Sequence, residues 1–101
     1  MISRNIIEEL AAEELVDANT KHDPKFNSPH EAYAVLKEEV EEMEVEVDLC
    51  KDRLHMLWDC VKNDDDQNAE HNLNYIRAYA TKAAQEAIQV VAMCDKASKL
   101  Y

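Results

Sequence analysis

The fold is decided by one long stretch, PHEAYAVLKEEVEEMEVEVDLCKDRLHMLWDCVK, which fills residues 29–62. Its apolar residues recur at alternating steps of four and three, and this spacing places them along one side of an α-helix. The line consists of Leu36, Val40, Met43, Val47, Cys50, Leu54, Leu57 and Val61. Because no helix-breaking residue interrupts it, we expect one packed helix on the order of 50 Å long.

The residues around position 28 predict where this helix begins. Ser28 can accept from a free backbone N–H group, Pro29 suits the first helical position, and Glu31 has the spacing of a capping box. Asp23 and Ser28 each precede a proline, which disfavours helix there. The sequence therefore predicts a break at about residues 21–28.

Two further helices are expected on either side. The first covers about residues 2–19, with Ser3 as its candidate cap. A polar connection at about residues 62–72 contains Asp64, Asp65 and Asp66, which favour a solvated loop with a helix cap over a metal site. The third helix covers about residues 69–100. The sequence thus predicts an all-α protein with a single helical domain over residues 1–101.

The composition excludes several classes of function. Glycine is absent, so no Gly-rich phosphate loop can form, and phosphate chemistry would depend on side chains and metal. The formal net charge of −11 argues against binding duplex nucleic acid or an anionic membrane. The apolar runs are too short to span a bilayer, and the N-terminus does not lead into a signal-peptide core. We expect a cytoplasmic protein.

The third helix predicts association between copies. From Ala83 to Cys94, its only polar residues are Gln85, Glu86 and Gln89, which is typical of a segment enclosed on most sides. One chain offers only two other helices to cover it. We therefore expect a homodimer that completes a helical bundle.

The acids of residues 38–48 suggest a cation site. Glu39, Glu42 and Glu46 share one flank of the helix, whereas Glu38 and Glu41 face water. Carboxylates at i and i+3 can share a hard cation, although a simply solvated strip explains the same pattern.

A second acid, in the third helix, favours the metal hypothesis. Glu86 lies in an otherwise apolar segment, where an ionised carboxylate is costly unless it is paired or metal-bound. Lys82 could pair with it at i, i+4, and Gln89 could add a weak amide ligand. Taken together, the two helices favour a metal site.

Residues 26–36, FNSPHEAYAVL, and the Glu-Glu-x-Glu-Glu run after them resemble the MazG-like branch of the all-α nucleotide pyrophosphohydrolases. Residues 86–93, EAIQVVAM, resemble the matching helix of small phage-associated members. The resemblance covers about residues 20–96. It implies a bundle built by dimers or tetramers, with an ExxE pair and an ExxD pair that bind magnesium.

Carried onto this chain, the resemblance assigns Glu39 and Glu42 to the first pair and Glu86 to the second. Gln89 stands where the family usually has aspartate, which removes one negative charge. The two pairs are also farther apart in sequence than is usual in the family.

The implied reaction is hydrolysis of a (deoxy)nucleoside triphosphate to the monophosphate and pyrophosphate with Mg²⁺, for which Mn²⁺ could substitute. Glu38 or Glu46 would orient or deprotonate the water. Asn27, His30 and Lys82 are the candidate substrate contacts, with Phe26 as a stacking residue. The alternative is a catalytically silent helical protein that binds nucleotide or a protein partner.

Overall fold

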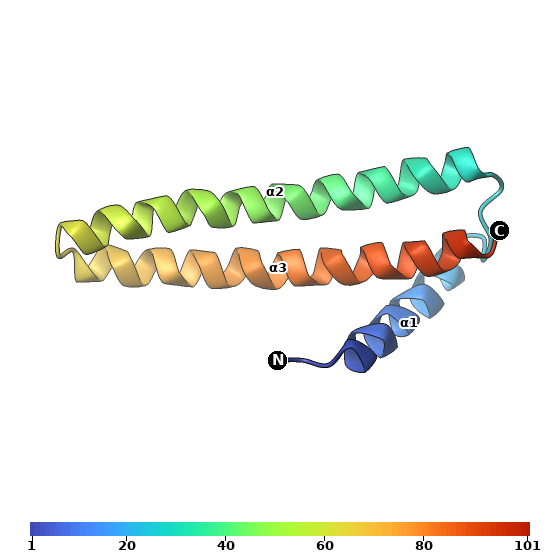
Figure 1. Cartoon of the computed structure of the whole chain (residues 1–101), viewed down its shortest axis with the longest axis horizontal. Helices are drawn as coiled ribbons and strands as arrows, with labels where there is room; N and C mark the ends of the chain where they lie inside the picture. Colours follow the sequence, from blue (N-terminus) through green and yellow to red (C-terminus); the bar gives the residue numbers. More distant parts are fainter. The chain divides into compact units, whose positions relative to one another are not determined.

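The structure is a computed structural model that describes all of residues 1–101, and it is entirely helical (Figure 1). The three helices are α1 (Arg4–Lys21), α2 (Pro29–Lys62) and α3 (Asp66–Ser98). The predicted all-α class and the three helices are confirmed. None of the helices combines the length and the apolar character that are needed to cross a membrane.

Short polar side chains begin each helix, as the sequence predicts. The Ile6 backbone N–H donates to Ser3 Oγ over 3.3 Å, and the Glu31 N–H donates to Ser28 Oγ over 3.2 Å. Asp65 caps α3, where its Oδ1 accepts from the Asn68 N–H over 3.3 Å. Because this cap lies earlier than expected, α3 begins at Asp66 rather than near Ala69.

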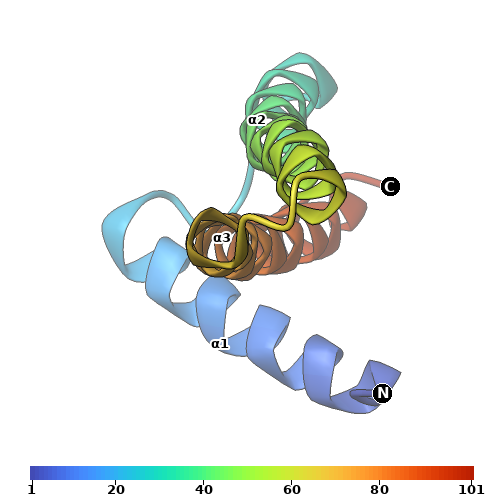
Figure 2. The ribbon, with the colours of Figure 1, turned by 90° about the vertical axis from the view of Figure 1, so that its left-hand side faces the viewer.

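The chain divides into two compact units. The first comprises Met1–Glu41 and Gln85–Tyr101, so it contains α1, the start of α2 and the end of α3. Within it, the end of α3 lies between α1 and the start of α2 (Figures 1 and 2). Its core is made of small residues and two larger ones, namely Ala11, Phe26, Ala32, Ala92, Met93 and Ala97.

The second unit, Glu42–Ala84, is a helical hairpin of α2 and α3. Partly buried polar contacts join its two arms. Asn72 is buried, and its Oδ1 accepts from Arg53 Nη1 over 3.3 Å, while the Arg53 guanidinium lies 3.8 Å from the centroid of the Tyr75 ring. Cys50 Sγ donates to the Ile76 carbonyl over 3.8 Å.

The apolar line of α2 is only partly covered in one chain. Leu54 and Val61 on this line are 59% and 53% exposed, although the line predicts a packed seam, and Trp58 next to the line is 57% exposed. Within the hairpin, α2 has only one neighbouring arm, so its outer apolar residues have nothing to pack against. Trp58 therefore does not belong to the core of this chain.

Candidate functional site

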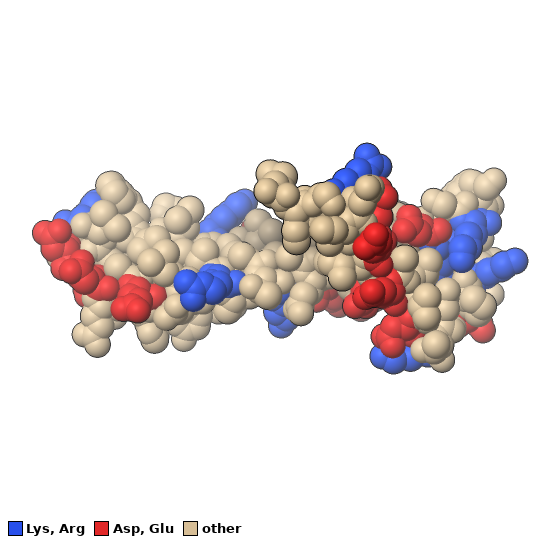
Figure 3. Space-filling view, turned by 90° about the horizontal axis from the view of Figure 1, so that it is seen from below, with Lys and Arg blue, Asp and Glu red and all other residues tan.

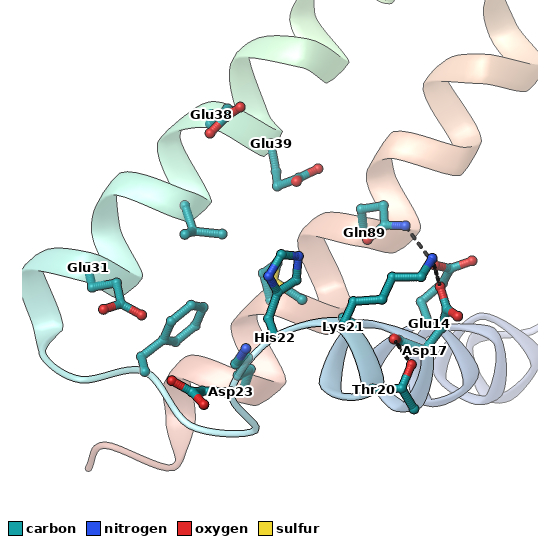
Figure 4. Close-up of a pocket in the computed structure, with 15 residues that line it drawn as sticks. Glu14, Asp17, Thr20, Lys21, His22, Asp23, Glu31, Glu38, Glu39 and Gln89 are labelled. Atoms are coloured by element: carbon teal, nitrogen blue, oxygen red, sulfur yellow. Dashed lines mark hydrogen bonds and ion pairs between the residues drawn. The ribbon is translucent and has the colours of Figure 1, made fainter.

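The first unit contains a cleft of about 990 Å³, lined by side chains from α1, the segment after it, the start of α2 and the end of α3 (Figure 4). In Figure 4, the Glu39 side chain points from α2 towards α3, where Gln89 lies. His22 extends from the segment after α1 into the space between them (Figure 4). The cleft therefore brings together residues that are far apart in the sequence.

Two acids from different helices meet beside this cleft. Glu39 on α2 and Glu86 on α3 are both half-buried and offer carboxylate oxygens within 4.8 Å of each other. Glu42 follows Glu39 by three residues on the unbroken α2 helix, and this spacing places it on the same face. The structure thus brings Glu39 and Glu86 together, as the metal hypothesis requires.

The donor atoms of these acids suit a hard divalent cation. Mg²⁺ binds through oxygen ligands, and commonly through one or two carboxylates together with substrate phosphates. Two carboxylates held within 4.8 Å also repel each other when both are ionised, and a shared cation would relieve this repulsion. The residues present therefore fit magnesium.

Gln89 is held by a residue that the sequence gave no reason to select. Its Nε2 donates to Oε2 of Glu14 on α1 over 2.6 Å. Glu14 and Gln89 line the main cleft and also a neighbouring cavity of about 340 Å³, which Glu86 lines as well. The hydrogen bond thus lies between the two cavities and fixes the Gln89 amide nitrogen towards α1.

The cleft is strongly acidic. Figure 3 shows acidic side chains along α1, which carries Glu8, Glu9, Glu13, Glu14 and Asp17. The carboxylates that line the cleft are those of Glu14, Asp17, Asp23, Glu31, Glu38 and Glu39. Lys21 also lines it but pairs with Asp17 over 3.1 Å. An anionic ligand would enter this cleft only with cations that offset the negative field.

The two candidate catalytic acids lie in different surroundings. Glu38 is exposed and lines the cleft. Glu46, in the second unit, is buried, and its Oε1 lies 3.6 Å from Lys82 Nζ, while its Oε2 accepts no hydrogen bond. Lys82 therefore forms its ion pair with Glu46 on α2, a partner that the sequence did not suggest.

Asn27 and His30, the other candidate substrate contacts, are exposed and do not line the cleft. Asn27 Nδ2 donates instead to Glu31 Oε2 over 3.0 Å. This contact engages the Glu31 carboxylate, which the sequence had assigned to a capping box.

The cleft also contains residues to which the sequence gave no role, among them Lys96 and His22. Lys96 is buried and lies over Phe26, with its Nζ 4.6 Å from the ring centroid. His22 lines the cleft, although its sequence neighbours gave it no role. Lys96 lies two turns after Gln89 on α3. In the sequence, only the spacing of Gln89, Met93 and Lys96, which places them on one face of the helix, could have indicated it.

Comparisons with known proteins found no match: no protein-family model, no curated protein and no solved structure matches the chain.

Proposed function

We propose that this protein is a Mg²⁺-dependent nucleotide pyrophosphohydrolase of the MazG-like type, which converts a (deoxy)nucleoside triphosphate to the monophosphate and pyrophosphate. The observation that supports this most strongly is the meeting of Glu39 and Glu86 within 4.8 Å. These acids are 47 positions apart in the chain (86 − 39), and they are the acids that the resemblance selects.

Glu39, Glu42 and Glu86 would hold magnesium, with the Gln89 carbonyl oxygen as a weaker ligand. When bound, the ion neutralises phosphate charge and lowers the pKa of a bound water. Glu38 is the better candidate for orienting the attacking water, because it lines the cleft and is exposed to solvent. Glu46 serves as the buried partner of Lys82 in this account.

The cleft is large enough for the proposed substrate. Its volume of about 990 Å³ lies at the upper end of the range for small-molecule sites, about 300–1,000 Å³. Its acidic lining suits a nucleotide that arrives as its magnesium complex better than a free polyanion.

A second candidate is a catalytically silent protein that binds nucleotide or a protein partner through the same helices. The hydrogen bond from Gln89 to Glu14 favours it, because this contact engages the side chain that replaces the usual aspartate. Such a protein would still bind Mg²⁺–nucleotide, but without turnover.

Association of copies is part of the same proposal. Leu54, Trp58 and Val61 lie on one side of α2 and are each more than half exposed. Burial of a large aromatic ring and two aliphatic side chains favours a second copy along the hairpin of the second unit.

The test is pyrophosphate release from a panel of ribo- and deoxynucleoside triphosphates, with and without Mg²⁺. We expect release with at least one substrate that depends on the metal and is lost in Glu39→Gln and Glu86→Gln. The matched control is Glu41→Gln, which removes a charge from an exposed residue on the same helix.

The same proteins distinguish the two candidates. Folded wild-type protein that releases nothing from any substrate would contradict the enzyme. If Mg²⁺ still raised its melting temperature and Glu39→Gln abolished that effect, the silent binding protein would be supported instead.

A further inference from the structure

Lys96 is a buried lysine without an acidic partner. It is only 5% exposed, yet none of the ion pairs in the structure involves it. Lysine is almost never fully buried unless it is paired, because removing an ammonium group from water is costly. The ring of Phe26, with its centroid 4.6 Å from Nζ, provides partial compensation through a cation–π contact.

The position of Lys96 directs this charge towards the cleft. Gln89, Met93 and Lys96 all line the cleft, and their spacing of four and three places them on one face of α3. Lys96 lies about 10 Å along the helix from Gln89, at a rise of about 1.5 Å per residue. The cleft thus has acids at one end of this face and an ammonium group farther along it.

Lys96 is buried and unpaired, unlike the other lysine of the cleft. Lys21 is exposed and already pairs with Asp17 over 3.1 Å. An ammonium group has three N–H donors, and the contact of Lys96 with a ring face leaves donors for an oxygen ligand. A buried, unpaired cation in a cleft is a binding group for an anion.

We propose that Lys96 binds the pyrophosphate end of the nucleotide, the group that leaves in the reaction. The identity of the ligand rests on the proposed function. The inference adds a binding residue for that ligand that lies outside the acid motifs. The acids would hold Mg²⁺, while Lys96 offers an unpaired positive charge within a mostly acidic lining. Phe26 positions the ammonium group and does not stack on the base.

The test is calorimetric titration of the full chain with pyrophosphate, inorganic phosphate or a nucleoside monophosphate, each in the presence of Mg²⁺. Lys96→Met should weaken pyrophosphate binding by about tenfold or more, because it removes a charge-assisted hydrogen bond. Monophosphate binding should not change. Lys99→Met, which removes the same charge from an exposed residue nearby, should bind pyrophosphate as the wild type does.

Two results would overturn the inference. One is wild-type affinity for pyrophosphate in a folded Lys96→Met variant. The other is Lys96-dependent binding of inorganic phosphate with no preference for pyrophosphate, which would identify a site for free phosphate.

If circular dichroism shows that Lys96→Met does not fold, NMR of the lysine side-chain ammonium groups of the wild-type protein tests the inference instead. With Lys96→Arg used for assignment, pyrophosphate should shift the Lys96 signal, and an unmoved signal would contradict the inference.

The titrations need no turnover, so the two proposals fail separately. Absence of hydrolysis would count against the proposed function alone. Hydrolysis by the wild type, with pyrophosphate affinity unchanged in Lys96→Met, would count against Lys96 alone.

Discussion

At the scale of single residues, Gln89 is the position on which the proposed chemistry depends most. It stands one turn after Glu86 and donates its amide hydrogen to Glu14 over 2.6 Å. A carboxylate in its place would lose this hydrogen bond and face the negative charge of Glu14. The same carboxylate would add a charged oxygen ligand next to Glu86.

Gln89→Asp should therefore lower the melting temperature in the absence of metal and increase the stabilisation that Mg²⁺ provides. A gain of about 1.4 kcal/mol in binding corresponds to a tenfold tighter dissociation constant. Thermal melts over a range of Mg²⁺ concentrations measure both effects. Gln89→Asn is the control, since it shortens the side chain without adding charge. An identical response to Mg²⁺ in the two variants would place residue 89 outside the metal site.

The sequence predicted some of these residues and missed others for a physical reason. Glu39 and Glu86 could be selected because helical spacing and an apolar neighbourhood make their charges conspicuous. Glu14 could not, because it is one of several acids on α1, and only the packing of α1 on α3 selects it. Lys96 was missed as well, because its helical register with Gln89 and Met93 places it on their face of α3 but does not show that it is buried.

At the scale of helices, an ion pair between Lys82 on α3 and Glu46 on α2 stabilises the buried Glu46 carboxylate within the hairpin. Glu46 is 8% exposed, and one of its oxygens accepts no hydrogen bond. Its only ion pair is with Lys82, at 3.6 Å. Lys82 itself is largely exposed. The loss of stability on breaking the pair therefore comes mainly from the Glu46 carboxylate, which would remain buried without a partner.

Lys82→Met should destabilise the protein by about 1–3 kcal/mol, the cost of leaving a buried charged group without a partner. Urea denaturation measures this change. Adding Glu46→Gln should recover much of the loss, because the remaining side chain is neutral. Lys51→Met, at an exposed position on α2, is the matched control. If Lys82→Met were as stable as this control, the pair would have no structural role.

Helix limits were predictable to within a few residues because they depend on local chemistry. Ser3 and Ser28 cap their helices as expected. The start of α3 was missed because three successive aspartates are each able to cap, and the sequence does not show that Asp65 is the one used. Asp64, in the middle of the connection between α2 and α3, has φ 53°, which is the left-handed conformation.

At the scale of the whole molecule, the exposed apolar side of the hairpin argues for association. The line from Leu36 to Val61 predicts a buried seam, but in one chain its outer members are open to solvent. A second copy would bury them, and large aromatic side chains dominate the affinity of such interfaces.

Leu54→Ser and Trp58→Ser should each weaken self-association by about 2 kcal/mol or more. Sedimentation velocity at several protein concentrations measures the change in the monomer fraction. Tyr33→Ser removes another large exposed side chain, in the first unit, and should leave association unchanged. A wild-type protein that is monomeric at every concentration would contradict the proposed assembly.

The most direct test of the account is analysis of the products that form when a cleavable nucleoside triphosphate is incubated with the protein and Mg²⁺. We predict nucleoside monophosphate and pyrophosphate in equal amounts, with neither product formed by Glu39→Gln or by samples treated with a chelator. Nucleoside diphosphate and inorganic phosphate as the products, or equal turnover by Glu39→Gln, would contradict the assignment of Glu39 and Glu86 to a pyrophosphohydrolase metal site.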